Sequence, residues 1–337
     1  MTSRAVKLTQ HSGKPEEIYE LVTEAKPRAS PGHVVVRMTV MPVNPKDLQN
    51  GAGGMWLTLD LKDIYVGAEG TGVVEEVGDW VTTFSVGQRV IPLIFNRYVV
   101  EGFGVWRDYV EIPEADLITV PVGVSDEVAA QFFITPWLVY GILKEIDIPK
   151  GGYLVSNAAG SVVGRQLVQL AKHWDIKTIN VVRRDEQIKD LKDLGADEVI
   201  NSSTEDVFAR VKEITGGKLA HGVVDPIAGG TTKILATCVR NGGKVFLYGR
   251  LSSNDVILGV TELVRQVSLR FFMINDLGHD PAKRKETVSE VFQLLRQRVI
   301  EPAVGKTFPL KDFKEAIIET QKPGRVGKVL LINEPQT

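Results

Sequence analysis

The stretch "YLVSNAAGSVVGRQLVQLA" (residues 153–171) constrains the fold most, because it has the pattern of a buried strand, a turn of small residues and a helix. In such a unit, small residues allow a tight turn, and backbone N–H groups at the helix start can approach a phosphate. The G-x-G-x-x-G fingerprint is absent, although Ser161 can cap the helix and Gly164 falls on its first turn. These residues alone leave open both a nucleotide site and an ordinary strand-turn-helix.

Strand-like and helical patterns alternate around this stretch. Strands are expected near Tyr153, Thr178, Glu198, Gly222 and Lys244 and within residues 267–275, and helices at 161–174, 185–194, 205–213 and 231–239. This alternation is typical of βαβ units on a parallel sheet. We therefore expect an α/β, doubly wound Rossmann domain at residues 124–274.

The two ends of the chain have a different pattern. Short strand-like runs punctuated by Gly and Pro fill the first 120 residues or so, as in "GHVVVRMTVMPVN" (32–44) and "GTGVVEEVG" (70–78). The tail has two amphipathic helical patterns and a final strand, "GKVLLIN" (327–333). The pattern predicts a β-rich, largely antiparallel domain formed by residues 1–123 and 275–337.

Composition excludes several functional classes. The chain is 43% hydrophobic and 24% charged, with a formal net charge of -2, so neither nucleic acid nor a membrane is expected as a partner. A single cysteine, Cys238, excludes an internal disulfide and a cysteine-rich zinc site. The first residues lack the apolar run of a signal peptide. These features predict a cytoplasmic protein.

Two arginines follow the second predicted strand of the parallel sheet. Arg183 and Arg184 lie roughly twenty residues beyond the turn, where an NAD-binding chain has an acidic residue for the ribose 2′-hydroxyl. Guanidinium groups suit a 2′-phosphate instead. The pair favours NADP(H) over NAD(H), although two solvent-facing arginines would give the same pattern.

Several motifs resemble the zinc-independent medium-chain dehydrogenases/reductases, in particular their quinone oxidoreductase and 2-enoyl thioester reductase branch. These motifs are "VNPKDL" (43–48), "ITPWLVYGIL" (134–143), "SNAAGSVVGRQLVQLAK" (156–172) and "INVVRRD" (179–185). Zinc-dependent relatives have Gly-His-Glu where this chain has Gly67-Ala68-Glu69, and alanine cannot bind a metal. The resemblance implies a GroES-like catalytic domain beside the Rossmann domain, with no metal, and makes Glu69 a structural carboxylate.

The resemblance also implies where NADP(H) binds. The residues expected to bind the cofactor are Gly160, Ser161, Val162, Val163, Arg183, Arg184, Tyr248, Gly249, Phe272, Met273, Ile274 and Lys328. The candidates for the substrate pocket are Asn44, Trp56, Tyr65 and Thr135. Without the resemblance, core packing would explain Phe272 and Met273 equally well.

The chain departs from the family at its proton donor. Enoyl thioester reductases of this branch use a tyrosine, but their spacing leads here to Met55 and Trp56, and an indole N–H is no acid near neutral pH. Tyr65 is a weak substitute. Trp56 and Tyr65, with Tyr98, Phe103 and Trp106, could line an aromatic pocket for a planar carbonyl compound. The catalytic residues therefore stay unassigned.

These patterns predict an enzyme that transfers a hydride from NADPH to a quinone or an α,β-unsaturated carbonyl without zinc. Three alternatives stay open: a trans-2-enoyl thioester reductase, a zinc-free alcohol dehydrogenase, and an inactive NADPH-binding sensor or scaffold. Superfamily relatives often dimerise through the edge of the Rossmann sheet, and the apolar segment "VILGVTELVRQVSLRFF" (256–272) predicts a homodimer.

Overall fold

The computed structural model describes residues 1–10, 13–49, 64–274 and 280–333. Two compact units form, one from Met1–Ile134 with Pro302–Thr337 and the other from Thr135–Glu301. The sequence analysis placed these boundaries earlier, at 123/124 and 274/275. The helix at Asp126–Ala130 was expected in the Rossmann domain but groups with the first unit. The helix at Pro281–Arg296 was expected in the β-rich domain but groups with the second.

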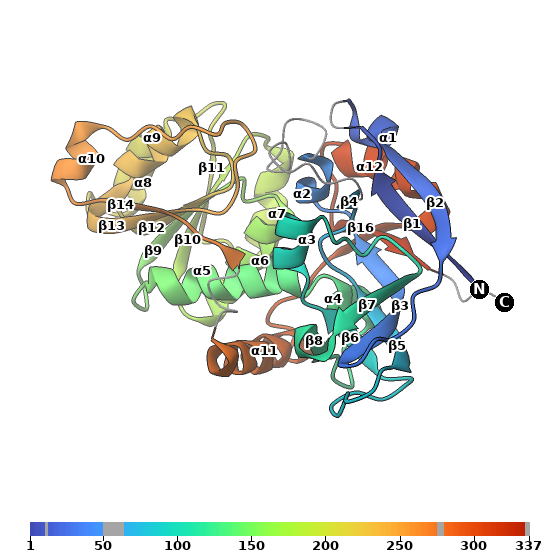
Figure 1. Cartoon of the computed structure of the whole chain (residues 1–337). Coiled ribbons are helices and arrows are strands. Elements are labelled where there is room, and N and C mark those ends of the chain that lie inside the picture. The colour runs from blue at the N-terminus through green and yellow to red at the C-terminus, as the bar shows by residue number, and fades with distance from the viewer. Residues whose placement is uncertain (11–12, 50–63, 275–279, 334–337) are drawn as a thin grey trace. The chain divides into compact units, whose positions relative to one another are not determined.

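The second unit is built on a six-stranded parallel sheet in the order β11-β10-β9-β12-β13-β14 (Figure 1). Its strands are β9 (Tyr153–Asn157), β10 (Lys177–Val182), β11 (Glu198–Asn201), β12 (Ala220–Asp225), β13 (Val239–Leu247) and β14 (Ser268–Phe271). Its helices are α5 (Leu138–Ile146), α6 (Val162–His173), α7 (Glu186–Leu194), α8 (Val207–Ile214), α9 (Gly230–Thr237), α10 (Val260–Val264) and α11 (Pro281–Arg296). The predicted doubly wound Rossmann fold is confirmed.

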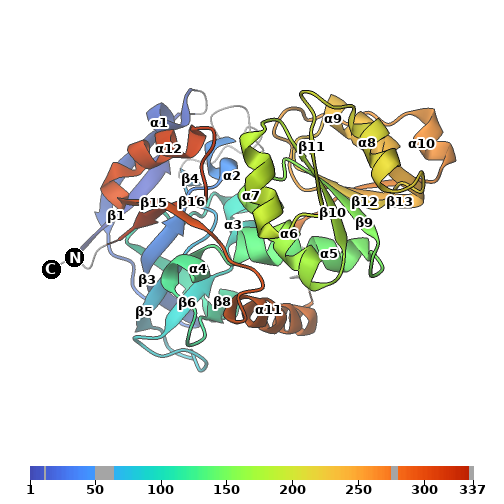
Figure 2. The same cartoon turned by 180° about the vertical axis from the view of Figure 1, so that it is seen from behind.

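Helices cover both faces of this sheet because its strands alternate between two cores. Val182 on β10 packs with Ala159, Val168 and Leu191 toward α6 and α7. The neighbouring Val181 joins the core that includes residues of α8 and α9. Figures 1 and 2 show α6 with α7, and α8 with α9, on opposite sides of the sheet. From β9 the strands are added first toward one edge of the sheet, as β10 and β11, and then toward the other, as β12, β13 and β14. This switch point between β9 and β12 is where the fold binds ligands.

The segment around Pro136 forms three successive helical pieces. Ser125 accepts a hydrogen bond from the Val128 N–H and caps α4 (Asp126–Ala130). A π-helical turn, η4 (Phe133–Trp137), then contains Pro136, and α5 follows it. Proline lacks an N–H and clashes with the preceding turn, so a regular helix does not continue through it.

The first unit contains the predicted, largely antiparallel β-domain, and two sheets build it. A three-stranded sheet has the order β2-β1-β4, and a larger one has the order β15-β16-β3-β5-β6-β8 with β7 also on β3. The strands are β1 (Thr2–Leu8), β2 (Tyr19–Ala25), β3 (His33–Pro42), β4 (Ile64–Tyr65), β5 (Thr71–Val77), β6 (Arg89–Pro92), β7 (Tyr109–Pro113), β8 (Leu117–Thr119), β15 (Val304–Pro309) and β16 (Lys328–Ile332). The remaining helices are α1 (Pro15–Ile18), α2 (Pro45–Leu48), α3 (Phe95–Glu101) and α12 (Phe313–Gln321).

The two ends of the chain meet in this unit. β16 pairs with β3 through Leu330↔Pro42 and Ile332↔Val40, and α12 lies beside α1 (Figure 2). One core of buried side chains from β1, β3, α12 and β16 holds these segments together. The closing strand therefore brings Lys328 to the end of β3, next to the start of the "VNPKDL" motif.

Candidate functional site

The turn between β9 and α6 has the geometry of a phosphate-binding loop. Ser161 accepts a hydrogen bond from the Gly164 N–H, at 3.1 Å, and caps α6. A Cβ on Gly164 would lie 2.4 Å from the Ala159 carbonyl oxygen, so a larger residue would push the helix off the strand. The first turn of α6 holds no acidic residue. The positive helix end and its free N–H groups at Val162 and Val163 therefore remain available to an anion.

The two arginines predicted to bind a 2′-phosphate lie just beyond β10. Arg183 is exposed and Arg184 is half-buried. Within the described part of the chain, neither guanidinium forms an ion pair, although acidic residues are as common as basic ones in this protein. Two unpaired guanidinium groups at the carboxyl end of a parallel strand suit a phosphate dianion.

Tyr248 and Gly249 follow β13 and reach the same turn. The Tyr248 hydroxyl is buried beside Ser161, and it has no well-formed hydrogen bond to the described residues. Burial raises the pKa of this phenol, and the negative charge of Asp225 raises it further, so it stays a proton donor. A Cβ on Gly249 would lie 2.6 Å from the Pro226 carbonyl oxygen, so the backbone is packed tightly here.

Phe272, Met273 and Ile274, predicted to bind the cofactor, lie in this unit together with Thr135, a candidate for the substrate pocket. Phe272 is buried and stacks on Phe246, whereas Met273 is 37% exposed. The Trp137 indole N–H donates to the Ile274 carbonyl oxygen at 3.2 Å, which ties η4 to the segment after β14. Thr135, on η4, is fully buried, and its hydroxyl has no partner among the described residues.

These residues fit an NADP(H) molecule. The Thr135 hydroxyl is a buried polar atom without a partner in the described chain, and the Tyr248 hydroxyl has only its contact with Ser161, whereas buried polar atoms are usually hydrogen-bonded. The α6 N-terminus suits a pyrophosphate, and the arginine pair suits a 2′-phosphate. The predicted cofactor residues Gly160 to Val163 lie in this turn, but Lys328 belongs to the other unit.

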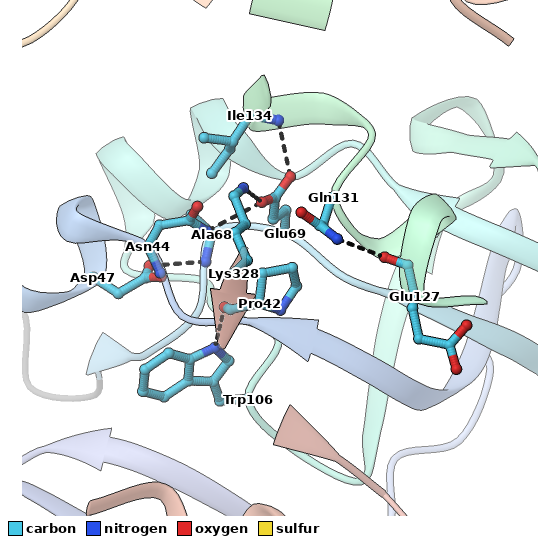
Figure 3. A network of polar contacts seen from close by, with 10 residues as sticks. All are labelled: Pro42, Asn44, Asp47, Ala68, Glu69, Trp106, Glu127, Gln131, Ile134 and Lys328. Atoms are coloured by element: carbon cyan, nitrogen blue, oxygen red, sulfur yellow. Dashed lines mark hydrogen bonds and ion pairs between the residues drawn. The ribbon is translucent and has the colours of Figure 1, made fainter. Parts of the chain in front are cut away.

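A buried polar network in the first unit surrounds Glu69 (Figure 3). Its carboxylate accepts hydrogen bonds from the Lys328 ammonium at 2.6 Å, the Asn44 amide at 3.1 Å and the Ile134 N–H at 2.8 Å. The Glu69 side chain is 1% exposed and that of Lys328 is 8% exposed. The Gly-Ala-Glu motif thus places its carboxylate against an ammonium group, and Glu69 has the structural role expected from the sequence.

Asp47 is a second carboxylate buried at this network. It accepts hydrogen bonds from the Asn44 N–H at 2.8 Å and the Ala68 N–H at 3.1 Å. Burial raises its pKa to about 6, because these bonds and one from Tyr98 only partly compensate the lost hydration, and Glu69 adds repulsion. Asp47 holds the "VNPKDL" motif against the Gly-Ala-Glu motif.

Asp47 should make the stability of the first unit depend on pH. Its folded pKa of about 6 lies above the ordinary value of 3.8 for an aspartate, so the folded state binds more protons between these pH values. The unfolding free energy should fall as pH rises from about 3 to about 7, by about 3 kcal/mol in all at 1.36 kcal/mol per pKa unit, and then level off. Chemical denaturation across this range measures the slope. In Asp47→Asn the slope should flatten; an unchanged slope would assign the effect to another group.

Three of the aromatic candidates for the substrate pocket, Tyr65, Tyr98 and Trp106, make other contacts in the first unit. Tyr98 and Trp106 are fully buried in the core, and the Trp106 indole N–H donates to the Pro42 carbonyl oxygen. Tyr65 donates its hydroxyl to Glu24 at 2.9 Å and stacks under the Arg107 guanidinium. Burial, and next the bond to Glu24, raise the pKa of Tyr65, which makes it a weaker acid. Trp56 lies outside the described residues.

The donor set around Ala68 does not suit a catalytic metal. Within the described ranges, three or more His, Cys, Asp or Glu side chains nowhere gather as a metal would require. Cys238, the single cysteine, is buried in the Rossmann unit, and burial raises the pKa of its thiol to about 12.

Helices in the described part of the chain are all too short or too polar to cross a bilayer.

Comparison with known proteins assigns the family. The Alcohol dehydrogenase GroES-like domain family matches residues 30–122, and the Zinc-binding dehydrogenase family matches residues 162–296. A mitochondrial enoyl-[acyl-carrier-protein] reductase of Caenorhabditis elegans is 35% identical over 286 residues, covering 82% of this chain and 80% of that protein. The chain is a medium-chain dehydrogenase/reductase. Its resemblance to this superfamily, expected from the motifs, is confirmed.

Two further relatives cover almost all of this medium-chain dehydrogenase/reductase. A 2-haloacrylate reductase of a Burkholderia species is 30% identical, and 97% of this chain matches 98% of that protein. The crystal structure of a putative NADPH:quinone reductase from Bacillus thuringiensis is 27% identical, with a TM-score of 0.88, and covers 99% of this chain and all of that one. These relatives, like the enoyl reductase, are oxidoreductases.

The structure also brings together residues that the sequence analysis did not predict. The Asp225 carboxylate, at the end of β12, binds the Asn157 amide, at the end of β9, and the Thr232 hydroxyl on α9. The strand predicted near Gly222 ends in "GVVD" (222–225). The acidic residue at its carboxyl end was the sequence signal that could have indicated a functional residue there. Trp137 was likewise missed, because its partner Ile274 is distant in the chain.

Proposed function

We propose that this protein catalyses the NADPH-dependent reduction of an electron-poor double bond conjugated to a carbonyl, as in quinones and α,β-unsaturated carbonyl compounds, without zinc. The observation that carries this proposal is the buried pair of Glu69 and Lys328, 2.6 Å apart, at the motif where zinc-dependent relatives bind their metal. The putative NADPH:quinone reductase and the 2-haloacrylate reductase among its relatives support it.

The protein's own residues would bind and orient the cofactor. Arg183 and Arg184 would hold the 2′-phosphate, and Ser161 with the α6 N-terminus would hold the pyrophosphate. The buried Thr135 hydroxyl offers a hydrogen bond to the carboxamide end. When bound, NADPH supplies the hydride.

Reduction of an enone needs one proton in addition to the hydride. Hydride addition at the β-carbon moves an electron pair onto the carbonyl oxygen, and the α-carbon then takes a proton. Tyr65 is engaged with Glu24, and the burial of Tyr248 disfavours its phenolate, so neither releases a proton readily. Water is therefore the proton source in this proposal, and positioning provides most of the rate enhancement.

A panel of acceptors tests the proposal. NADPH oxidation is followed with a quinone, an enone, a 2-haloacrylate and a crotonyl thioester, with NADH as the control donor. At least one of the first three acceptors should be reduced, with NADPH preferred. Tight NADPH binding without turnover of any acceptor would instead support the inactive sensor.

A second candidate is a trans-2-enoyl thioester reductase. The 35% identity to an enoyl-[acyl-carrier-protein] reductase favours it, and the missing family tyrosine opposes it. Turnover of the crotonyl thioester as fast as that of quinones and enones would establish this alternative.

A homodimer is a further part of the proposal. β14 lies at the edge of the parallel sheet, and nearby α10 exposes Val260, Leu263 and Val264 by 60% or more. Exposed apolar patches on edge elements favour self-association. Val260→Asp/Val264→Asp should shift the sedimentation coefficient from a dimer to a monomer, whereas Val122→Asp, another exposed valine, should not. A monomeric wild type at micromolar concentration would contradict the predicted dimer.

The cytoplasmic localisation expected from the sequence stays a prediction.

A further inference from the structure

A buried hydrogen-bond network links the end of β12, at the switch point of the parallel sheet, to the phosphate-binding turn after β9. The Asp225 carboxylate is fully buried and accepts hydrogen bonds from the Asn157 amide at 2.8 Å, the Ile227 N–H at 2.9 Å and the Thr232 hydroxyl at 2.7 Å. All three donors are neutral, and no ion pair reaches Asp225 in the described ranges. A charge buried without a counterion is costly, which calls for a reason to keep it.

Asn157 passes this contact on to the turn. Its Nδ2 donates to Asp225, which fixes the orientation of the amide and directs Oδ1 toward the next residue. Oδ1 accepts the Ala158 N–H at 2.8 Å. The Ala158 carbonyl oxygen in turn accepts the Ser161 N–H at 2.9 Å, and Ser161 caps α6. An unbroken chain of bonds thus runs from Asp225 to the start of the helix.

Ala158 is the strained member of this chain. Its φ of +50° lies in the left-handed region, which is unfavourable for a residue with a Cβ. Many dinucleotide-binding turns use glycine for tight backbone geometry, whereas this chain has alanine. A residue in this conformation persists only when its surroundings hold it there, and the bonds at its N–H and carbonyl do so.

We propose that Asp225 is a positioning residue for the cofactor: through the Asn157 amide it holds Ala158 in the left-handed conformation that directs the α6 N-terminus at the NADPH pyrophosphate. This inference rests on the proposed NADPH binding. It makes the Asn157–Asp225 pair a determinant of pyrophosphate affinity, separate from the arginine pair that would bind the 2′-phosphate.

The sign of one substitution separates positioning from simple electrostatics. Asp225→Asn removes a negative charge near an anion site, so a purely electrostatic role predicts tighter NADPH binding. Positioning predicts weaker binding, because an amide at 225 can direct an N–H group at the Asn157 N–H. The two donors would then repel each other, and the Asn157 side chain would no longer be held in place. We expect the Kd for NADPH to rise about tenfold in Asp225→Asn, and in Asn157→Asp, where two carboxylates would face each other.

The exchange variant Asn157→Asp/Asp225→Asn restores one amide and one carboxylate without changing the total charge. Its Kd for NADPH should return to within about threefold of the wild type. Thr232→Val, which removes one donor to Asp225, should raise the Kd about threefold and serves if the other variants do not fold. Thr178→Val is the matched control, because Thr178 is also buried but lies at the amino end of β10, away from Asp225 and the turn.

Binding of 2′-AMP, which has the 2′-phosphate but no pyrophosphate, provides the second measurement. All variants should bind 2′-AMP within twofold of the wild type in calorimetric titrations. A parallel loss of NADPH and 2′-AMP affinity, an unchanged NADPH affinity in folded Asp225→Asn, or no recovery in the exchange variant would each overturn the inference. Failure of the wild type to bind either ligand would instead contradict the proposed function.

Discussion

Replacing Lys328 with methionine should lower the unfolding free energy of this protein by about 3–5 kcal/mol, the usual cost of removing one partner of a buried ion pair. The variant leaves the Glu69 carboxylate, 1% exposed, with the Asn44 amide and the Ile134 N–H as its remaining donors among the described residues. Urea denaturation followed by tryptophan fluorescence measures the change.

Two further variants show whether the lost stability comes from the unpaired charge. Lys306→Met removes an ammonium from the Lys306–Glu319 pair, in which the lysine is 66% exposed, and should cost less than about 1 kcal/mol. Glu69→Gln/Lys328→Met removes both charges of the pair and should be more stable than Lys328→Met alone. If Lys328→Met cost no more than Lys306→Met, the pair would not be a buried ion pair in solution.

The sequence predicts the Rossmann unit well because its signals are local. The helix expected at 161–174 is Val162–His173, and the one expected at 185–194 is Glu186–Leu194. Each has a periodic apolar face, and Ser161 marks the start of the first. The turn residues and the arginine pair adjoin these elements, so their positions along the chain also place them in space.

The N-terminal sheet was missed because its signals are weak. β1 pairs with β2 along its whole length, from Thr2↔Ala25 to Leu8↔Tyr19, but β2 buries only its first residue fully and lacks a clear alternation of apolar and polar residues. β4 contains only two residues. Such strands are defined by their partners rather than by their own sequence.

The buried polar contacts are beyond local sequence patterns. Lys328 and Glu69 are 259 positions apart, and Asn157 and Asp225 are 68 apart. Lys328 reaches Glu69 because β3 pairs with both β16 and β5, the strand that follows Glu69. Asp225 reaches Asn157 because β12 pairs with β9. The resemblance to a family suggested a cofactor role for Lys328, which stays a prediction, but not the bond of its ammonium to Glu69.

Arg183→Ala/Arg184→Ala should raise the Kd for NADPH about 30- to 100-fold and leave the Kd for NADH within about threefold. Charge-assisted hydrogen bonds contribute about 1.5–3 kcal/mol each, and solvent screening reduces the contribution of the exposed Arg183. The loss for NADPH should shrink at high salt, because screening already weakens the wild-type contacts. Fluorescence titration of both dinucleotides at two salt concentrations measures these effects.

Two controls separate charge from geometry in this prediction. Arg298→Ala removes an arginine that is 84% exposed after α11 and should leave both dissociation constants unchanged. Arg183→Lys/Arg184→Lys keeps the charge without the planar fork, so its Kd for NADPH should fall between those of the wild type and the double alanine variant. An equal loss of NADPH and NADH affinity would show that the arginines support the turn rather than recognise the 2′-phosphate. Retention of the NADPH preference without either arginine would assign that preference to other residues.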